Sequence, residues 1–174
     1  MILEIYDCKI IICGPAIGKT YLAEHDDRFI DLDEIKANYK YGLYNATREE
    51  MEKGKLNRVK VVNEDSTKYA IGILEKELKN NKIILISSGN NGVVKYILDN
   101  KIKYCLVYAG LELLDEYKKR MIQRGNNSIF VDKIANEQKW EEDYIKSVND
   151  VNATYKIELK KGQYLSDIKD RFFA

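Results

Sequence analysis

Short apolar runs alternate along the chain with longer amphipathic stretches. Five runs are rich in β-branched residues, end at polar turns and have the length of buried strands: 9–13, 29–32, 83–86, 103–108 and 155–159. Apolar residues at helical spacing predict helices over 19–24, 58–78, 93–98, 111–124, 132–148 and 165–173, and a capping box at Thr47 predicts a short helix ending near Gly54. This alternation predicts an α/β fold with a mainly parallel five-stranded sheet and helices on both faces.

The first apolar run leads directly into a glycine-containing loop. The sequence CGPAIGKT occupies residues 13–20, so a predicted strand precedes it and a predicted helix follows. In this context backbone N–H groups cradle nucleotide phosphates, the lysine reaches the outer phosphates and the threonine hydroxyl ligates Mg²⁺. We therefore expect ATP and Mg²⁺ to bind here, through Gly14, Pro15, Ala16, Ile17, Gly18, Lys19, Thr20 and Tyr21. An ordinary strand–turn–helix with a surface lysine is the alternative.

Cys13 is the point at which this loop departs from the usual pattern. A glycine is usual there, and in this chain it comes one residue later, at Gly14. A cysteine is restricted to ordinary backbone angles, so the turn has less conformational freedom at this position. Pro15 is the only proline of the chain and stiffens the loop.

Composition and charge narrow the class of protein. The chain has 174 residues, with 29 Lys and Arg against 28 Asp and Glu, and its net charge of +1 gives no overall attraction to nucleic acid or membrane. No apolar run is long enough to cross a bilayer and no secretory signal is evident, so we expect one cytoplasmic domain over 1–174. Cys8, Cys13 and Cys105 lack metal-ligand spacing and are expected to be buried free thiols.

Two carboxylates stand where the second apolar run ends. Asp31 and Asp33 are two residues apart, so they face the same way in an extended chain. Beside a bound triphosphate, Asp31 is placed to hold Mg²⁺ together with Thr20, and Asp33 to orient the acceptor or take a proton from an acceptor hydroxyl. Helix capping by Asp33, with Asp31 exposed, is the alternative.

Small residues follow the third apolar run. Ser88 and Gly89 would let a substrate approach the backbone closely, although a plain strand–helix turn with a Ser or Asn cap explains them equally well. No acidic residue ends this run, so the usual Mg²⁺ partner of phosphate-loop ATPases is missing. This absence shifts the prediction toward Asp31 and Asp33 and away from motor-type ATPases.

A pair of arginines marks the end of the predicted helix 111–124. Arg120 and Arg124 are four residues apart and share one face, just before a Gly-Asn-Asn-Ser stretch. This arrangement predicts a lid over about 120–131 that brings both cations to the transferring phosphoryl group. The alternative is that basic residues simply favour the carboxyl end of a helix.

The order of these motifs resembles the small P-loop kinases, a group that includes nucleoside monophosphate kinases, shikimate kinase and gluconate kinase. Residues 29–33 look like the shikimate kinase segment in which the first Asp serves Mg²⁺ and the second binds a substrate hydroxyl. As a whole, the chain looks closer to phage and low-GC bacterial nucleotide-kinase-like proteins, which share its Gly-x-Tyr-Leu-Ser-Asp-Ile stretch at 162–168. The resemblance implies a three-layer P-loop fold with strand order 2-3-1-4-5. It also implies an acceptor-binding insert over about 34–60, in which Arg58 would pair with a phosphate.

These observations together predict an ATP- and Mg²⁺-dependent phosphotransferase whose acceptor is a nucleoside or deoxynucleoside monophosphate. Its expected catalytic residues are Lys19, Asp33, Arg120 and Arg124; its substrate contacts are Asp31, Asp33, Arg58, Ser88 and Gly89; its metal site is Thr20 with Asp31. The expected partner is a small-molecule acceptor, not nucleic acid or a membrane, and the oligomeric state stays open. A shikimate- or gluconate-like metabolite kinase, or a nucleotide-binding regulatory module without turnover, is the alternative.

Overall fold

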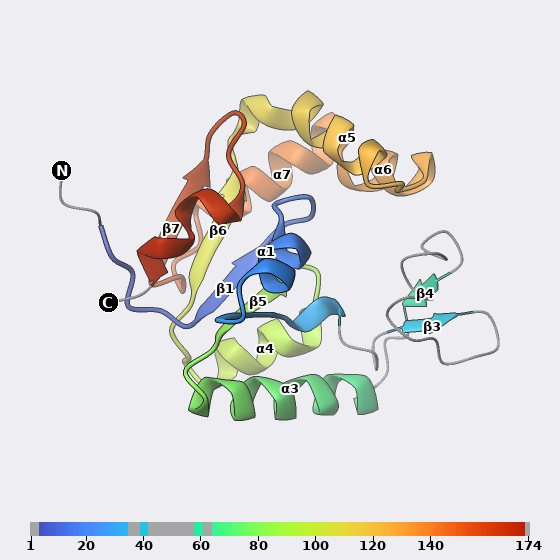
Figure 1. Ribbon diagram of the computed structural model, residues 1–174. Coiled ribbons are helices and arrows are strands. Elements are labelled where there is room, and N and C mark those ends of the chain that lie inside the picture. The colour runs from blue at the N-terminus through green and yellow to red at the C-terminus, as the bar shows by residue number, and fades with distance from the viewer. Residues whose placement is uncertain (1–3, 35–38, 42–57, 61–63, 173–174) are drawn as a thin grey trace.

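A five-stranded parallel sheet forms the centre of the protein (Figure 1). The computed structural model describes residues 4–34, 39–41, 58–60 and 64–172. The strands are β1 (Ile10–Cys13), β2 (Phe29–Asp31), β5 (Ile83–Ser87), β6 (Cys105–Ala109) and β7 (Tyr155–Leu159). They lie side by side as β2-β5-β1-β6-β7, and every neighbouring pair is parallel. Counted within this sheet the order is 2-3-1-4-5, so the predicted fold class is confirmed.

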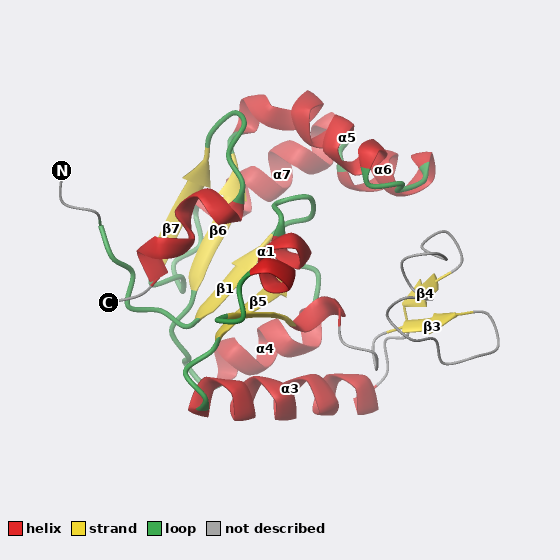
Figure 2. Ribbon diagram, in the orientation of Figure 1, coloured by secondary structure: helices red, strands yellow, loops and turns green. Residues whose placement is uncertain are grey.

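Helices lie on both faces of the sheet (Figure 2). They are α1 (Lys19–His25), α3 (Glu64–Lys79), α4 (Asn91–Asp99), α5 (Leu114–Gln123), α6 (Ser128–Ile134) and α7 (Glu137–Val148), with 3-10 turns η1 (Leu32–Glu34), η4 (Leu111–Leu113) and η5 (Leu165–Phe172). The connection from β1 to β2 runs across the sheet in the opposite direction to that from β2 to β5. Since such crossovers are right-handed, α1 and α3 fall on opposite faces. Accordingly, α1 packs with η5 and α3 packs with α4.

The central strands β1 and β5 are apolar along most of their length because helices cover them from both sides. All four residues of β1 are buried, as are the first four of β5. Ile11 of β1 lies in register with Leu85 and Cys105 on the flanking strands. Cys8, Cys13 and Cys105 are buried free thiols, as predicted. No helix among the described residues has the length and apolar character needed to cross a bilayer.

Three predicted helices differ from the structure. Residues 58–60 belong not to a helix but to β4 (Arg58–Lys60), which pairs with β3 (Tyr39–Tyr41) in a separate antiparallel sheet. Pairing with a distant strand favours the extended conformation over a helix here, and the spacing of apolar residues in the sequence does not predict such pairing. The stretch 132–148 is divided between α6 and α7 because the Asn136 side chain accepts a hydrogen bond from Lys139 N and caps a new helix. The C-terminal element η5 is a 3-10 helix.

Part of the predicted acceptor-binding insert lies outside the described residues. The helix expected from Thr47 to Gly54 falls entirely in that part of the chain. Arg58 has a place in the backbone of β4, but its side chain is not among those described. The insert over 34–60 and the phosphate contact of Arg58 therefore stay predictions.

The buried hydroxyl of Tyr117 allows a prediction about the free energy of unfolding. Tyr117 is 1% exposed, and its hydroxyl has no hydrogen-bond partner among the described residues. Since a buried polar group without a partner costs free energy, we expect Tyr117→Phe to leave the free energy of unfolding unchanged or to raise it by about 1 kcal/mol. The matched control is Tyr104→Phe, because the Tyr104 hydroxyl donates to Asp150 at 2.8 Å and its removal should cost about 1 kcal/mol. Urea unfolding measures both, and a loss of more than about 1 kcal/mol in Tyr117→Phe would contradict the expectation.

Candidate functional site

The loop between β1 and α1 turns at residues other than Cys13. Cys13 ends β1 in extended conformation, in register with Ser87 and Val107. The left-handed conformations of this loop lie at Ala16, with φ 58°, and at Gly18, with φ 100°, which is the N-cap of α1. A cysteine is therefore accommodated where the usual pattern has a glycine, because this position belongs to the strand and needs no positive φ.

Lys19 folds back over this loop toward the second strand. Its Nζ lies 3.4 Å from the Gly14 carbonyl oxygen and 3.7 Å from Asp33 Oδ2, and its side chain is 11% exposed. Burial lowers the pKa of Lys19, but the neighbouring Cys13, Asp31 and Asp33 outweigh it, so that the pKa is raised above its ordinary value. The ammonium group thus stays charged and lies between the Gly14 carbonyl oxygen and Asp33.

Asp31 ties the second strand to the first turn of α1. It is 8% exposed, its Oδ2 accepts a hydrogen bond from the Thr20 hydroxyl at 2.9 Å, and its Oδ1 accepts one from Asp33 N at 3.1 Å. The structure therefore brings together the two residues predicted to hold a metal, and Asp31 is buried rather than exposed. One hydroxyl and one carboxylate suit Mg²⁺, which takes few protein ligands and keeps waters and substrate phosphates around it. Among the described residues there is no group of three or more His, Cys, Asp or Glu suited to a metal.

The burial of Asp31 predicts a pH dependence. Burial raises the pKa of Asp31 to about 6, because the ionised form is poorly solvated there. Between the ordinary carboxyl pKa and this value the folded state binds more protons than the unfolded state, so the free energy of unfolding falls as the pH rises from about 4 to about 6, by about 3 kcal/mol. Urea unfolding from pH 4 to pH 8 measures this slope. Asp31→Asn should lack it, and an identical slope in the two proteins would contradict the assignment.

Asp33 bridges the loop lysine and the turn after β5. It is 6% exposed; Oδ2 accepts a hydrogen bond from Ser87 N at 2.6 Å, and Oδ1 accepts one from the Asn90 side chain at 3.4 Å. Both oxygens of the predicted general base are thus already used in holding the turn. Asn90 stands at the N-cap position of α4. Its side chain makes no cap hydrogen bond to α4, the helix that follows, and reaches Asp33 instead.

The turn that Asp33 holds carries the predicted substrate residues. Ser88 N donates to the Cys13 carbonyl oxygen at 2.9 Å, which fixes the turn to the end of β1. Ser88 and Gly89 are both exposed there. The structure therefore places them beside the loop between β1 and α1, at the carboxyl edge of the sheet, where ligands bind in open parallel sheets.

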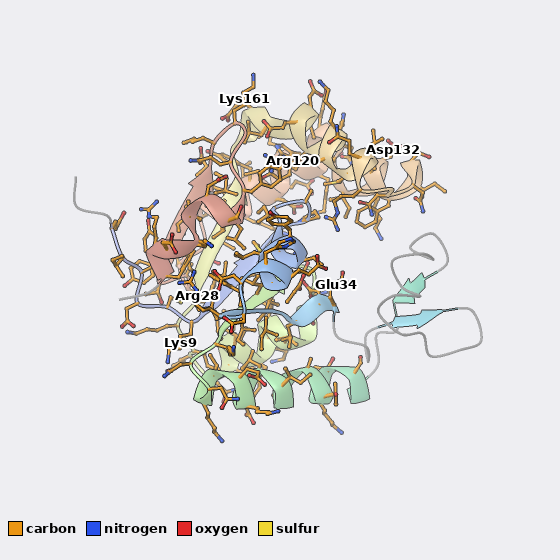
Figure 3. The ribbon with its side chains drawn as sticks, viewed as in Figure 1. Lys9, Arg28, Glu34, Arg120, Asp132 and Lys161 are labelled. Atoms are coloured by element: carbon orange, nitrogen blue, oxygen red, sulfur yellow. The ribbon has the colours of Figure 1, made fainter. Side chains whose placement is uncertain are left out.

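The two arginines of α5 have different surroundings. Arg120, labelled in Figure 3, is 6% exposed and donates hydrogen bonds to the Ala16 and Gln163 carbonyl oxygens at 3.4 and 3.0 Å. Arg124, at the C-cap of α5, is exposed and has no ion pair with a described residue. Its positive charge acts to lower the pKa of Lys19, so it lies within electrostatic reach of the loop. The lid predicted over 120–131 corresponds to the end of α5, the following turn and the start of α6.

The remaining predicted nucleotide contacts divide between the loop and the helix. Pro15 is partly exposed and Ile17 is buried, whereas Tyr21 is 59% exposed. The Tyr21 ring stacks on His25, one turn along α1, with 4.0 Å between ring centroids. Glu116, Gln163 and Tyr164 surround Arg120, and no contact between these three residues and Arg120 was predicted from the sequence.

Comparisons with known proteins do not assign the chain to a family. No protein-family model matches it, and no curated protein matches it either. Among solved structures it is similar to an uncharacterized protein from Eubacterium ventriosum ATCC 27560, with 15% identity over 95% of each chain and a TM-score of 0.45. A likeness this distant carries no argument about function. Any function assigned to this protein must therefore come from its own site.

Proposed function

We propose that the protein is an ATP- and Mg²⁺-dependent phosphotransferase whose acceptor is a small molecule, foremost a nucleoside or deoxynucleoside monophosphate. The supporting observation is one connected network at the carboxyl edge of the sheet. In it, Lys19 pairs with Asp33, Asp33 N donates to Asp31, and Asp31 accepts from Thr20. A lysine and a hydroxyl at the end of a glycine loop, with carboxylates at the end of β2 and in the turn that follows it, are the groups that phosphoryl transfer requires.

Each residue has a distinct task in this proposal. The loop amides and Lys19 bind the outer phosphates of ATP, and Thr20 with Asp31 would hold Mg²⁺, which supplies charge neutralisation at the transferring group. Asp33 keeps Lys19 and the Ser88–Gly89 turn in place. Arg124 is exposed near the loop and is available to meet the negative charge that develops during transfer.

The hydrogen bonds of Asp33 favour a phosphate acceptor over a hydroxyl acceptor. A hydroxyl nucleophile needs a base to take its proton, whereas a monophosphate oxygen is already ionised at neutral pH. The carboxylate of Asp33 already accepts from Ser87 N and from Asn90. This occupied carboxylate supports a nucleotide acceptor rather than a shikimate- or gluconate-like one.

The test is a screen of acceptors with labelled ATP and Mg²⁺. We expect label to appear in at least one nucleoside or deoxynucleoside diphosphate, with nucleoside monophosphates as acceptors. Transfer only to a sugar or hydroxy acid would replace the nucleotide acceptor with a metabolite. No transfer to any member of either set would contradict the phosphotransferase.

A nucleotide-binding module without turnover is the second candidate. It is favoured by the engagement of two predicted catalytic groups, Asp33 and Arg120, in hydrogen bonds within the protein. Such a module would show a thermal shift with ATP and Mg²⁺ but no transfer, and Asp33→Asn would leave its function in the cell intact. Loss of that function in Asp33→Asn, in a protein that remains folded, would speak against the module.

A further inference from the structure

Arg120 lies in an enclosed position that a mobile cation would not need. Its guanidinium carbon is 3.8 Å from the centre of the Tyr164 ring and 4.5 Å from that of Tyr117, so it is close to two aromatic rings. Its Nη2 donates to the Gln163 carbonyl oxygen at 3.0 Å and also to Glu116. Arginine suits this position because its planar group combines stacking on rings with several hydrogen bonds at once.

The same guanidinium reaches the part of the loop that turns. Nη1 lies 3.4 Å from the carbonyl oxygen of Ala16, which holds a left-handed conformation with φ 58° although it is not a glycine. Such a conformation is unfavourable for an L-residue and persists only where its surroundings hold it. The hydrogen bond from Arg120 is one of the contacts that hold Ala16 in this conformation.

The C-terminal turn, residues 160–165 between the end of β7 and the start of η5, is attached to the loop by the same cluster. Leu165 N donates to the Ile17 carbonyl oxygen at 3.0 Å, and Glu116 accepts from Gly162 N at 3.0 Å. A Cβ added to Gly18 would lie 3.4 Å from Cδ1 of Tyr164, so the ring packs directly on the loop. Arg120 thus stands where α5, the C-terminal turn and the phosphate loop meet.

We propose that Arg120 is a positioning residue, which holds Ala16 to Gly18 in the shape that binds phosphate by fastening this loop to Tyr164 and the C-terminal turn. It differs in this from Arg124, which is exposed one helical turn further along. The expected effect on nucleotide affinity rests on the proposed function. The expected effect on the order of the loop does not.

Hydrogen exchange of the protein without nucleotide tests the order of the loop. The probe is the amide of Leu165, which donates to Ile17, and the reference is the amide of Ile84, which donates to Lys9 in the sheet. We expect Arg120→Lys to speed exchange at Leu165 about tenfold and to leave Ile84 unchanged, because lysine cannot replace both the stacking and the hydrogen bonds. Lys119→Ala, which removes an exposed neighbouring cation, should change neither amide. Unchanged exchange at Leu165 in Arg120→Lys would overturn the proposal.

Tyr164→Ala keeps the test decisive if Arg120→Lys does not fold. Tyr164 is 41% exposed, so its removal leaves the core intact while taking away one of the rings beside Arg120. It should also speed exchange at Leu165 and not at Ile84, and equal exchange in Tyr164→Ala and the unaltered protein would overturn the proposal.

Titration with Mg²⁺ and ATP then separates positioning from transition-state stabilisation. A positioning residue acts on bound nucleotide throughout the reaction, so Arg120→Lys should raise the Kd for ATP about tenfold and change kcat little. A fall in kcat with unchanged Kd would identify Arg120 as a transition-state cation and overturn the proposal. If the unaltered protein binds no nucleotide, the proposed function fails, and exchange at Leu165 still decides the role of Arg120 in the loop.

Discussion

Lys19→Met should reduce phosphoryl transfer from ATP by a factor of about 10²–10³, because it removes the ammonium that would meet the outer phosphates. Lys19 is the charged group of the loop itself, with its Nζ 3.4 Å from the Gly14 carbonyl oxygen and 3.7 Å from Asp33 Oδ2. Methionine has nearly the same length and flexibility, so the loss would report the charge rather than the packing. The rate of label transfer from ATP to the best acceptor of the screen measures it.

A matched variant controls for the general effect of losing a lysine. Lys95, on α4, is 74% exposed and pairs with Asp99, one turn away. Lys95→Met should leave the transfer rate and the thermal shift with ATP unchanged, since an exposed pair of this kind contributes little. Transfer by Lys19→Met within about threefold of the unaltered rate would contradict the role of Lys19 and the proposed function with it. Near-ultraviolet circular dichroism confirms that each variant is folded.

Asp33→Ala should lower the free energy of unfolding by about 3 kcal/mol, because it leaves the partners of a buried carboxylate unpaired. The Ser87 N–H would lose its acceptor, and Lys19 would lose its ion pair with Asp33. Asp33→Asn keeps one acceptor oxygen for Ser87 and should cost less than Asp33→Ala. Urea unfolding at neutral pH measures both changes.

Asp170 provides the comparison for a carboxylate that matters little. It pairs with Arg28 at 3.3 Å, but its side chain is 71% exposed, so Asp170→Ala should change the free energy of unfolding by less than about 1 kcal/mol. If Asp33→Ala were as stable as Asp170→Ala, Asp33 could not be the bridge between the loop and the turn after β5. That result would contradict the role of Asp33 in the proposed site, which is to hold Lys19 and the turn after β5 in place.

The strands of the sheet were predictable because their signal is local. The strands β1, β5 and β6 are short apolar runs that are buried along most of their length, and their apolar residues stand next to one another in the sequence. Two of the three helical predictions that differ from the structure did so for reasons outside that signal. Residues 58–60 pair with residues 39–41, and Asn136 divides a continuous amphipathic pattern by capping a new helix.

The members of the site were more predictable than their surroundings. Lys19, Thr20, Asp31 and Asp33 were found from the sequence, and the structure brings them together. The partners of Asp33 were not found, since Ser87 and Asn90 lie 54 and 57 residues away from it in the chain. The enclosed position of Arg120 was not predicted either. Its ring partner Tyr164 is far from it in the sequence, because α6, α7 and β7 come between them.

The sequence by itself determined the parallel α/β sheet and the glycine-containing loop between a buried strand and a helix. Both follow from neighbouring residues: the alternation of apolar runs with amphipathic stretches, and a glycine loop ending in Lys19 and Thr20. Only the tertiary structure decided that Asp33 is held by a distant turn, that Arg120 is enclosed and that burial raises the pKa of Asp31 to about 6. These properties depend on which segments the crossovers of the sheet bring side by side. Contacts between residues that are distant in the sequence cannot be predicted from a local pattern of residues.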